Sequence, residues 1–513
     1  MKKLEEMTLQ EKIGQLIIVG FPSPYYDENL KTLVEKYKCG NVIMFTRNFQ
    51  NASQMKKLCT DVHKNIYKET GLYPFISIDQ EGGLVTRLMK DVTFPPSQMT
   101  SSASAIPNAP YLVGKMIGRD MIRLGLNIDL APCLEINPDL ENELTNVRSY
   151  SSDPVIAGKY AHDFIKGLKE NGVLGCAKHF PGAGDDKVDS HLELPIIDID
   201  KETMHKTGLV PFKENLDVPC IMTTHTLFTV YDTVPATLSK NILKGLLRSE
   251  LNYQGLIMSD CMEMKAIADH YGSANGALMS LKAGCDFVLV CHTFETQVEA
   301  FEKVYQAALN NELTIEEINE KVGRIIKFKE MTLPYLEKYF FNDNEYQVSI
   351  ENNVLASTIV DKSLTKILGN EPILTADSLV LTPKASVSSI VEDEFDDRSL
   401  SKVLHKEFPN TKVYEFSNDD KVIEKIKREV TTTNNIIIFS YDVSKDEKQK
   451  NLINEILRTG KECYVISLKG PMDQKEFVNL NNYLCLYEYT PNSIKTIVKY
   501  LKKELKPEGK LPK

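Results

Sequence analysis

The chain lacks tryptophan, long apolar runs and a strong excess of either charge. Its 513 residues include 61 basic and 71 acidic side chains, so the formal net charge is −10. No apolar run approaches the ~20 residues that a membrane-spanning helix needs. The acidic excess also argues against a nucleic-acid or anionic-membrane partner, because both attract basic surfaces. The composition is that of an ordinary soluble globular protein.

Neither a secretory signal nor a disulfide pattern is present. Residues Met1–Leu9 lack the basic-then-apolar order of a signal, so we expect a cytoplasmic location, with secretion left open if a leader was trimmed. Ten cysteines occur without any Cys-x-x-Cys pair. Cysteines inside apolar runs predict small buried thiols in a reducing compartment, and four of them lie in such runs: Cys176, Cys220, Cys285 and Cys291.

Short apolar, β-branched runs recur along the first 300 or so residues. Helical periodicity separates most of these runs, as at Ala157–Asn171 and Ser239–Leu251. Eight buried-type strands alternating with helices predict a closed parallel (β/α)₈ barrel of the TIM type. From periodicity alone an open doubly wound sheet is the alternative. The eight runs are Leu16–Gly20, Asn41–Phe45, Phe75–Asp79, Ile128–Pro132, Leu174–His179, Cys220–His225, Leu256–Asp260 and Phe287–Cys291.

Polar residues at the ends of these runs favour the barrel. Asp79, His179, His225 and Asp260 each close one run at its C-terminal end. In a barrel, side chains from that end of different strands converge on one pocket. The sequence therefore predicts a functional site at the C-terminal mouth.

The strand–helix alternation breaks after Val322–Phe328. We expect a barrel domain at 1–335, a polar linker at 336–351 and a smaller α/β domain of open-sheet type at 352–513. The last segment contains no Gly-rich phosphate loop and no clustered His or Cys, so it suggests no chemistry of its own. Its predicted strands are Leu379–Thr382, Lys412–Phe416, Ile436–Ser440, Cys463–Leu468 and Tyr483–Tyr489, with helices such as Asp419–Glu429 and Asp446–Arg458 between them.

A Gly/Pro-rich loop follows the fifth run and holds an Asp–His pair. Asp189 and His191 stand two residues apart, after Lys178 and His179 at the strand end. A carboxylate beside an imidazole fixes the ring's tautomer and stabilises the imidazolium, which suits a general acid that later acts as a base. The alternative is a surface loop in which both side chains cap backbone groups. The neighbouring Lys-His favours the catalytic interpretation.

Asp260 ends the seventh run. An aspartate held at a barrel mouth can attack an anomeric carbon and form a covalent glycosyl intermediate. The alternative is an N-cap for the following helix. Glu263 is a competing nucleophile, but it lies beyond the strand end and is expected to be solvated.

Five motifs occur here in the order found in glycoside hydrolase family 3, and the chain resembles that family's bacterial β-N-acetylglucosaminidase branch. The resemblance is strong over about residues 5–330 and weaker beyond. Three further stretches fit, namely Asn137–Pro138, Val234–Ser239 and Leu281–Asp286. The motifs are Ile78–Gly83, Asn146–Ser149, Lys178–Gly182, Asp189–His191 and Met258–Asp260.

The resemblance implies a role for each matched position. Asp260 matches the family's nucleophile, and Asp189 and His191 match the acid/base dyad of this branch. Other branches take a glutamate from a later domain instead. The residues that match those holding the sugar are Asp79, Arg87, Arg148, Lys178 and His179. Arg148 could instead be a buried ion-pair partner, and His225 is as easily structural as substrate-facing.

The chain departs from the family pattern in the catalytic loop. Ala183 stands where the family usually has histidine, and Asp186 stands where it has threonine. An unpaired Asp186 would raise the pKa of His191. The change puts loop conformation and subsite preference in question more than catalysis.

The expected function is that of a retaining exo-β-N-acetylhexosaminidase, a glycoside hydrolase that releases N-acetylglucosamine from peptidoglycan fragments or chitooligosaccharides. A β-glucosidase or β-xylosidase of the same family is one alternative. A phosphorylase that uses phosphate as acceptor is another, because a neutral imidazole base does not repel an anion. A non-catalytic sugar-binding protein is the least favoured. We expect an oligosaccharide or amino-sugar glycoside as partner, and no cofactor or metal, since Asp189 and His191 lack further ligands.

Overall fold

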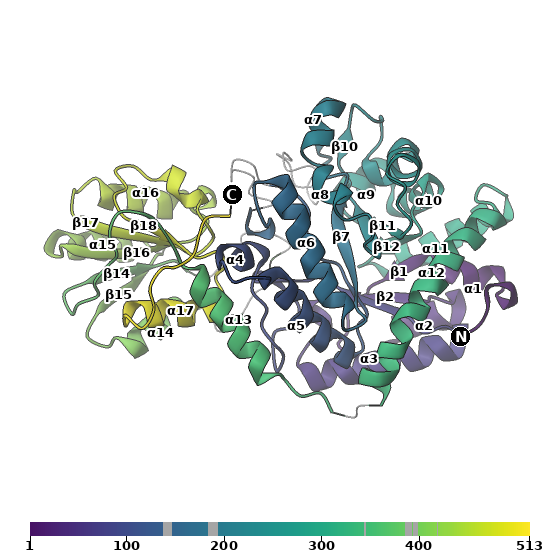
Figure 1. Ribbon diagram of the computed structural model, residues 1–513, viewed down its shortest axis with the longest axis horizontal. Coiled ribbons are helices and arrows are strands. Elements are labelled where there is room, and N and C mark those ends of the chain that lie inside the picture. The colour runs from purple at the N-terminus through teal and green to yellow at the C-terminus, as the bar shows by residue number, and fades with distance from the viewer. Residues whose placement is uncertain are drawn as a thin grey trace.

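The computed structural model describes residues 1–136, 146–182, 193–342, 345–384, 392, 399–417 and 419–512. Figure 1 shows two parts side by side, a barrel with its helices and a smaller layered part formed by the C-terminal segments. Helix α13 (Ile350–Ser363) runs between them.

Eight parallel strands close into a barrel, which confirms the predicted fold class. The barrel closes where β1 pairs with β12, with Val19 opposite Val290. Nearly all residues of these strands are buried, as expected when a parallel sheet is covered on both faces. In order around the barrel they are β1 (Ile17–Val19), β2 (Asn41–Met44), β3 (Phe75–Ile78), β6 (Ile128–Asp129), β7 (Leu174–Phe180), β9 (Cys220–Thr223), β11 (Leu256–Cys261) and β12 (Phe287–Val290). Each lies within or beside one of the eight runs expected from sequence.

Helices surround the barrel, and most of them bury their apolar faces in one continuous core with it. Among the described residues these helical segments are η1 (Leu4–Glu6), α1 (Leu9–Gly14), α2 (Glu28–Tyr37), η2 (Thr46–Asn48), α3 (Ala52–Thr70), α4 (Gln98–Ala103), α5 (Ala109–Leu124), η3 (Asn146–Arg148), α6 (Pro154–Lys169), α7 (Lys201–Lys206), α8 (Val210–Lys213), η4 (Ala236–Leu238), the π-helical η5 (Asn241–Glu250), α9 (Lys265–Tyr271), α10 (Ser273–Ala283), α11 (Phe294–Leu309), α12 (Ile315–Leu336) and η6 (Glu337–Phe341). Two short strand pairs sit outside the barrel, β4 (Gln80–Gly82) with β5 (Val85–Thr86) and β8 (Ile196–Ile197) with β10 (Leu227–Phe228).

The second part is a six-stranded sheet in the order β13-β18-β17-β16-β14-β15. Five of these strands were predicted. The sixth, β13, was missed, and it pairs antiparallel with β18 in an otherwise parallel sheet. The strands are β13 (Thr365–Leu368), β14 (Leu379–Thr382), β15 (Lys412–Glu415), β16 (Asn435–Ser440), β17 (Glu462–Ser467) and β18 (Tyr483–Cys485). The domain boundaries at 335/336 and 351/352 stay a prediction.

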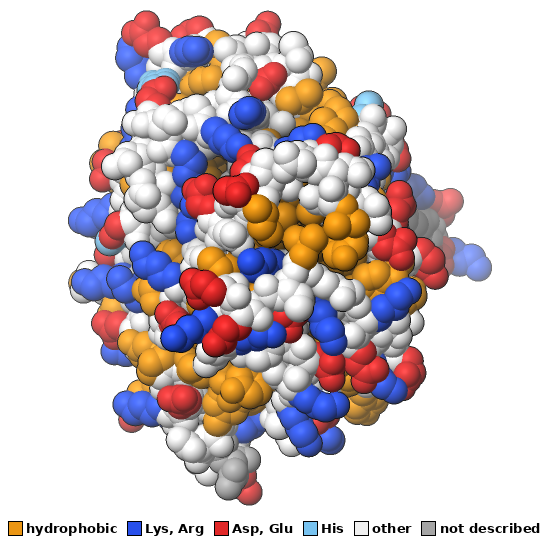
Figure 2. Space-filling model, turned by 90° about the vertical axis from the view of Figure 1, so that its right-hand side faces the viewer, with side chains coloured by type: hydrophobic (Ala, Val, Ile, Leu, Met, Phe, Trp, Pro, Cys, Tyr) orange, Lys and Arg blue, Asp and Glu red, His pale blue; other side chains and the backbone are white. Residues whose placement is uncertain are grey.

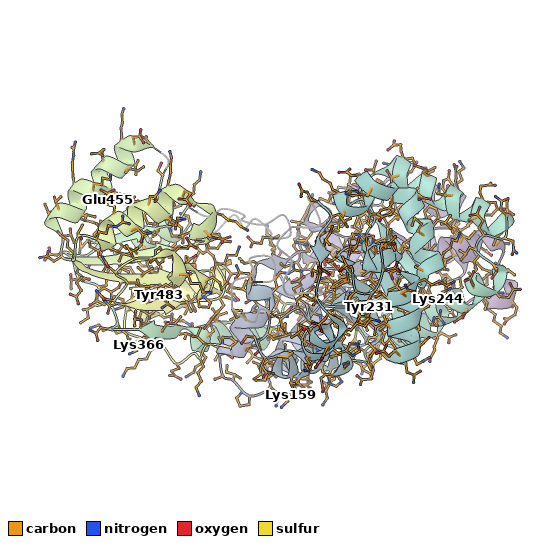
Figure 3. All side chains as sticks on the ribbon, turned by 90° about the horizontal axis from the view of Figure 1, so that it is seen from above. Lys159, Tyr231, Lys244, Lys366, Glu455 and Tyr483 are labelled. Carbon is orange, nitrogen blue, oxygen red and sulfur yellow. The ribbon has the colours of Figure 1, made fainter. Side chains whose placement is uncertain are left out.

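Helices cover both faces of this sheet and give it two apolar clusters. One cluster includes residues of α14 (Leu400–Glu407) and α17 (Pro491–Leu501). The other includes residues of α15 (Asp420–Thr432) and α16 (Glu447–Leu457), and it also takes in η7 (Val443–Lys445). The short η8 (Met472–Glu476) precedes β18. Figure 3 shows each part filled with side chains, with Tyr483 inside the sheet part and Tyr231 inside the barrel part.

The two parts share a packed seam. The first apolar cluster of the sheet continues into the barrel part through Leu84, Met99 and Val147. At the same seam the buried carboxylate of Glu488 accepts hydrogen bonds from the Ser97 amide (2.8 Å) and the Thr100 hydroxyl (2.7 Å). Helix α4, which starts after Ser97, is thereby fixed to the sheet.

The surface is mixed in character. On the face in Figure 2, acidic and basic side chains are interspersed, with apolar patches between them. Within the described part of the chain, every helix is too short or too polar to cross a lipid bilayer.

A buried lysine on α12 predicts how stability depends on pH. Lys329 Nζ donates to Gln15 Oε1 (2.6 Å) and to the Gly40 carbonyl (3.0 Å). Burial lowers the pKa of Lys329 to about 7, whereas an unfolded lysine titrates near pH ~10.4. The unfolded state therefore binds more protons between these values, so the free energy of unfolding should rise as pH rises from about 7 to about 10, by roughly 4 kcal/mol.

Denaturant unfolding of Lys329→Met and the native protein over this pH range tests the assignment. The native curve should gain stability with pH relative to Lys329→Met, which has no group to titrate there. The exposed Lys159 supplies the control, since Lys159→Met should follow the native pH dependence. Parallel curves for Lys329→Met and the native chain would show that Lys329 keeps an ordinary pKa.

Candidate active site

The predicted binding and nucleophile residues gather at the C-terminal ends of the barrel strands. Asp79 directly follows β3, while Lys178 and His179 lie near the end of β7. Asp260 is the penultimate residue of β11. Arg87 follows the short strand β5, and Arg148 ends η3 (Asn146–Arg148).

Ion pairs join these residues into one network around Glu81. Glu81 lies in β4, and Arg148 donates two hydrogen bonds of 2.8 Å to its carboxylate. Lys178 Nζ lies 2.7 Å from Glu81 Oε1 and donates to Asp79 Oδ1 at 2.8 Å. Arg87 Nη2 lies 3.9 Å from Asp79 Oδ2. The structure therefore brings Asp79, Arg87, Arg148 and Lys178 together.

Burial makes the charges of this network interdependent. The Glu81 and Lys178 side chains are only 2% and 3% exposed. Burial alone would raise the pKa of Glu81, but the charges of Arg148 and Lys178 hold it well below its ordinary range. Burial alone would lower the pKa of Lys178, but Asp79 and Glu81 raise it. Both groups are thus kept ionised.

The pKa of one acid next to the network is shifted in the opposite direction from that of Glu81. Burial raises the pKa of Asp129, at the end of β6, well above its ordinary range, against the hydrogen bond that the Gln80 amide donates to Asp129 Oδ1 (3.0 Å). The neighbouring carboxylates Asp79 and Glu81 push in the same direction as burial. The shift favours the neutral form of the Asp129 carboxyl group.

His179 connects this network to Asp260. Its Nδ1 lies 2.5 Å from Glu135 Oε1, and the same oxygen accepts the His179 backbone amide at 2.9 Å. Burial alone would raise the pKa of Glu135, but the charge and hydrogen bond of His179 lower it. An ionised Glu135 fixes the proton of the imidazole on Nδ1. The other ring nitrogen, Nε2, lies 3.8 Å from Asp260 Oδ2.

Asp260 keeps contact with solvent at the barrel mouth, since its side chain is 24% exposed. Its Oδ1 accepts the amide hydrogen of Cys261 at 2.7 Å. The N-cap alternative does not hold, because helix α9 begins at Lys265 with Met264 at its N-cap. Glu263 was expected to be solvated, but it accepts the backbone amides of His292 (2.6 Å) and Thr293 (2.9 Å), which ties it to the loop after β12.

The remaining predicted residues divide into a structural one and ones that lie outside the described residues. His225 is buried, and its Nε2 lies 2.9 Å from the Cys261 carbonyl, which fits the structural alternative. Asp189 and His191, together with Ala183 and Asp186, fall in the range 183–192, outside the described residues.

One group of ligand-type atoms among the described residues was tested for a metal. Atoms of Cys133, Glu135 and His179 lie within 4.8 Å of one another. Burial raises the pKa of Cys133 well above its ordinary range, so the thiolate that would bind a metal is disfavoured. The cation of Arg148 also acts on both Cys133 and Glu135. These residues fit an ion-pair cluster better than a divalent cation.

Glu81 and Glu135 were not among the predicted site residues. Glu135 lies in the loop six residues after the end of β6, so the rule that found Asp79 and Asp260 at strand ends does not select it. Glu81 belongs to a recognised motif, but it lies in a hairpin beyond the strand end, where alternation of strands and helices gives no signal.

The network predicts that removal of the Glu81 charge destabilises the fold. Glu81→Gln leaves Arg148 and Lys178 buried without their shared anion, which should lower the free energy of unfolding by about 3 kcal/mol. Urea denaturation at neutral pH measures the change. Glu299→Gln on the exposed face of α11 is the matched control and should be neutral. Equal stability of the two variants would contradict the central position given to Glu81.

Two curated proteins and one solved structure are similar to this chain. A β-hexosaminidase A of Pseudoalteromonas piscicida is 31% identical over 327 residues, which cover 58% of this chain and 54% of that protein. A β-hexosaminidase of Photobacterium profundum is 32% identical over 281 residues, 54% of this chain and 81% of that protein. The solved structure of a family 3 β-N-acetylglucosaminidase from Paenibacillus sp. str. FPU-7 matches with a TM-score of 0.91 at 29% identity, covering 99% of this chain and 98% of that one.

The family model for the glycosyl hydrolase family 3 N-terminal domain matches residues 8–328. That range contains all eight barrel strands and every residue of the ionic network. The resemblance inferred from the five motifs is confirmed. The chain belongs to glycosyl hydrolase family 3, a family of enzymes.

Proposed function

We propose that the protein is a retaining exo-β-N-acetylhexosaminidase with Asp260 as its nucleophile. The supporting observation is the position of Asp260, a solvent-accessible carboxylate on a barrel strand end, 3.8 Å from an imidazole that belongs to a buried ionic network. The similarity to proteins named β-hexosaminidase and β-N-acetylglucosaminidase supports the N-acetylated sugar.

The sugar is held by the network. Asp79 and Arg87 lie 3.9 Å apart, and we assign both to the binding of sugar hydroxyl groups. Carboxylate and guanidinium groups can each bind two hydroxyls at once, which discriminates by geometry as well as by energy. Lys178 and Arg148 are both paired with Glu81, and this pairing fixes the shape of the sugar-binding subsite. We assign their remaining N–H groups to hydrogen bonds with the sugar.

The first chemical step joins Asp260 to the sugar. The carboxylate attacks the anomeric carbon while His191, paired with Asp189, protonates the glycosidic oxygen. The bond from that carbon to the leaving oxygen breaks, and a glycosyl-aspartate of inverted configuration forms. The hydrogen bond between His179 and Glu135 holds the imidazole beside Asp260.

The second step releases the sugar. His191 takes a proton from water, which attacks the anomeric carbon and returns Asp260 as a carboxylate, so the configuration is retained overall. The natural substrates we propose are peptidoglycan fragments or chitooligosaccharides with a terminal N-acetylglucosamine, consistent with a cytoplasmic role in peptidoglycan recycling. Cleavage of nitrophenyl N-acetylglucosaminide but not of nitrophenyl glucoside would support this choice. Analysis of the products formed with and without phosphate distinguishes hydrolysis from phosphorolysis.

Asp260→Asn should abolish turnover of every glycoside. The asparagine amide cannot form the glycosyl-aspartate intermediate. We therefore expect kcat/KM to fall by about 10⁴-fold or more for both nitrophenyl and natural substrates. Release of nitrophenol measures it. Asp217→Asn, at an exposed aspartate, is the control and should leave the rate unchanged. A rate above a tenth of the native value in Asp260→Asn would remove the nucleophile assignment.

His191→Ala should distinguish substrates by their leaving groups. Nitrophenol departs without protonation, so kcat/KM of its glycoside, which reports the first step, should fall little. The kcat/KM of a substrate with an oligosaccharide leaving group should fall by about 10²–10⁴-fold. Kinetics on the two substrates with the same variant supply the comparison. Equal losses on both would contradict the general-acid role of His191.

A further inference from the structure

A pair of cysteines lies directly beside the proposed nucleophile. Cys261 follows Asp260 at the end of β11, and Cys291 directly follows the neighbouring strand β12. The two strands pair in parallel, with Cys261 opposite Leu289, two residues before Cys291. The thiols of Cys261 and Cys291 are hydrogen-bonded to each other.

Arg47 and His292 lie close to this pair, together with the carboxylates of Asp260 and Glu263, which raise the pKa of Cys291. Arg47, after β2, donates from Nη2 to the Cys291 carbonyl (2.9 Å), and its Nη1 lies 3.4 Å from His292 Nδ1. The side chain of His292 also hydrogen-bonds the thiol of Cys261. The hydrogen bond from Cys291 and the contact with His292 lower the pKa of Cys261, whereas burial raises that of Cys291. A lowered pKa increases the fraction of Cys261 that is present as the reactive thiolate.

A second cysteine pair in the same barrel provides an internal comparison. Cys176 on β7 and Cys220 on β9 are direct partners in the strand register, and their thiols are also hydrogen-bonded. Both are fully buried, and burial raises the pKa of Cys220 well above its ordinary range. No neighbouring cation contributes to the pKa shift of Cys220. The two thiols lie together in both pairs, but only in the first pair is the pKa of one thiol lowered.

The first pair can also be reached from outside. Cys261 is 8% exposed, the largest value among the ten cysteines, all of which are free thiols. A molecule as small as a hydroperoxide needs only such a narrow opening. Cys291 is 1% exposed.

We propose that Cys261 and Cys291 are a hydroperoxide-sensitive thiol pair that closes to a disulfide beside Asp260. The Cys261 thiolate attacks one peroxide oxygen, the O–O bond breaks and a sulfenic acid forms with release of water. The Cys291 thiol then attacks the sulfur of Cys261, the S–O bond breaks and a second water leaves. In sum, two thiols and one hydrogen peroxide give one disulfide and two waters, and an external dithiol reverses the reaction.

The disulfide would disturb the catalytic carboxylate through the backbone of Cys261. That residue's amide donates to Asp260 Oδ1 at 2.7 Å, and its carbonyl accepts from His225 Nε2 at 2.9 Å. Drawing Cys261 toward Cys291 strains both bonds and shifts Asp260 away from the anomeric carbon. The loss of activity rests on the proposed function, but formation of the disulfide does not.

Peptide mapping of the full-length protein tests the bond itself. Native protein treated with hydrogen peroxide is alkylated with N-ethylmaleimide and digested with trypsin. We expect the peptide Ser249–Lys265, which contains Cys261, to be linked to Ala283–Lys303, which contains Cys291. The alkylated forms of Cys176 and Cys220 should be unchanged. The absence of the linked peptide, or a link between Cys176 and Cys220 in its place, would overturn the proposal.

Cys291→Ser provides the matched variant, because Ala283–Lys303 also contains Cys285. In Cys291→Ser the link should vanish, and a 1,3-diketone should trap the sulfenic acid of Cys261. Cys176→Ser should behave as the native chain does. A link that persists in Cys291→Ser would assign the bond to Cys285 and contradict the proposed pair.

Activity on nitrophenyl N-acetylglucosaminide supplies the second readout. The rate of the oxidised native protein should be lower than that of the reduced protein by about tenfold or more. Dithiothreitol should restore the rate, and because it does not reduce methionine sulfoxide, the recovery would be due to the disulfide. A disulfide that forms without loss of rate would contradict the switch. If the reduced protein cleaves no glycoside but the linked peptide forms, the proposed function fails and the thiol pair stands.

Discussion

The salt bridge of Glu81 with Arg148 and Lys178 is the interaction on which the candidate site depends. Three segments far apart in sequence contribute one group each, namely the β4–β5 hairpin, η3 and strand β7. A buried ion pair adds little net stability, because desolvation offsets most of the attraction, but loss of one partner leaves a costly unpaired charge. Such an arrangement therefore specifies one geometry more than it strengthens the fold. Here it fixes where Lys178, and with it the adjacent His179, can lie.

The same network sets the charge that Asp260 experiences. Lys178 and Arg148 are neutralised by Glu81 and Asp79, and burial raises the pKa of Asp129. Glu135 is paired with His179, and the other nitrogen of that imidazole lies 3.8 Å from Asp260 Oδ2. A nucleophilic carboxylate has to stay ionised, and nearby carboxylates would raise its pKa. The arrangement keeps the other acids occupied and leaves Asp260 as the acid that faces the imidazole.

The sequence predicted what periodicity and strand ends encode. All eight barrel strands follow from buried runs, and Asp79, Lys178 and Asp260 follow from their place at strand ends. Strand β13 was missed because its four residues are partly exposed and directly follow a helix, so they show neither a buried run nor clear alternation. Glu81 was missed because its role comes from partners about 70 and 100 residues away. Contacts of that kind depend on the closed barrel, which no local pattern describes.

The seam with the sheet bears on the site for a steric reason. The hairpin that carries Glu81 continues into Gly82 and Gly83, which have φ angles of +95° and +59°. A Cβ at Gly82 would lie 2.2 Å from the Pro96 carbonyl oxygen, and one at Gly83 would lie 2.4 Å from Ser97 Cβ, so only glycine fits so close to that segment. Ser97 in turn donates its amide to Glu488, in the sheet part. The sheet thus supports the segment behind the hairpin, and through it the position of Glu81. This chain of contacts gives the C-terminal part a task although it contributes no described residue to the ionic network: it holds the support of a site built by the barrel.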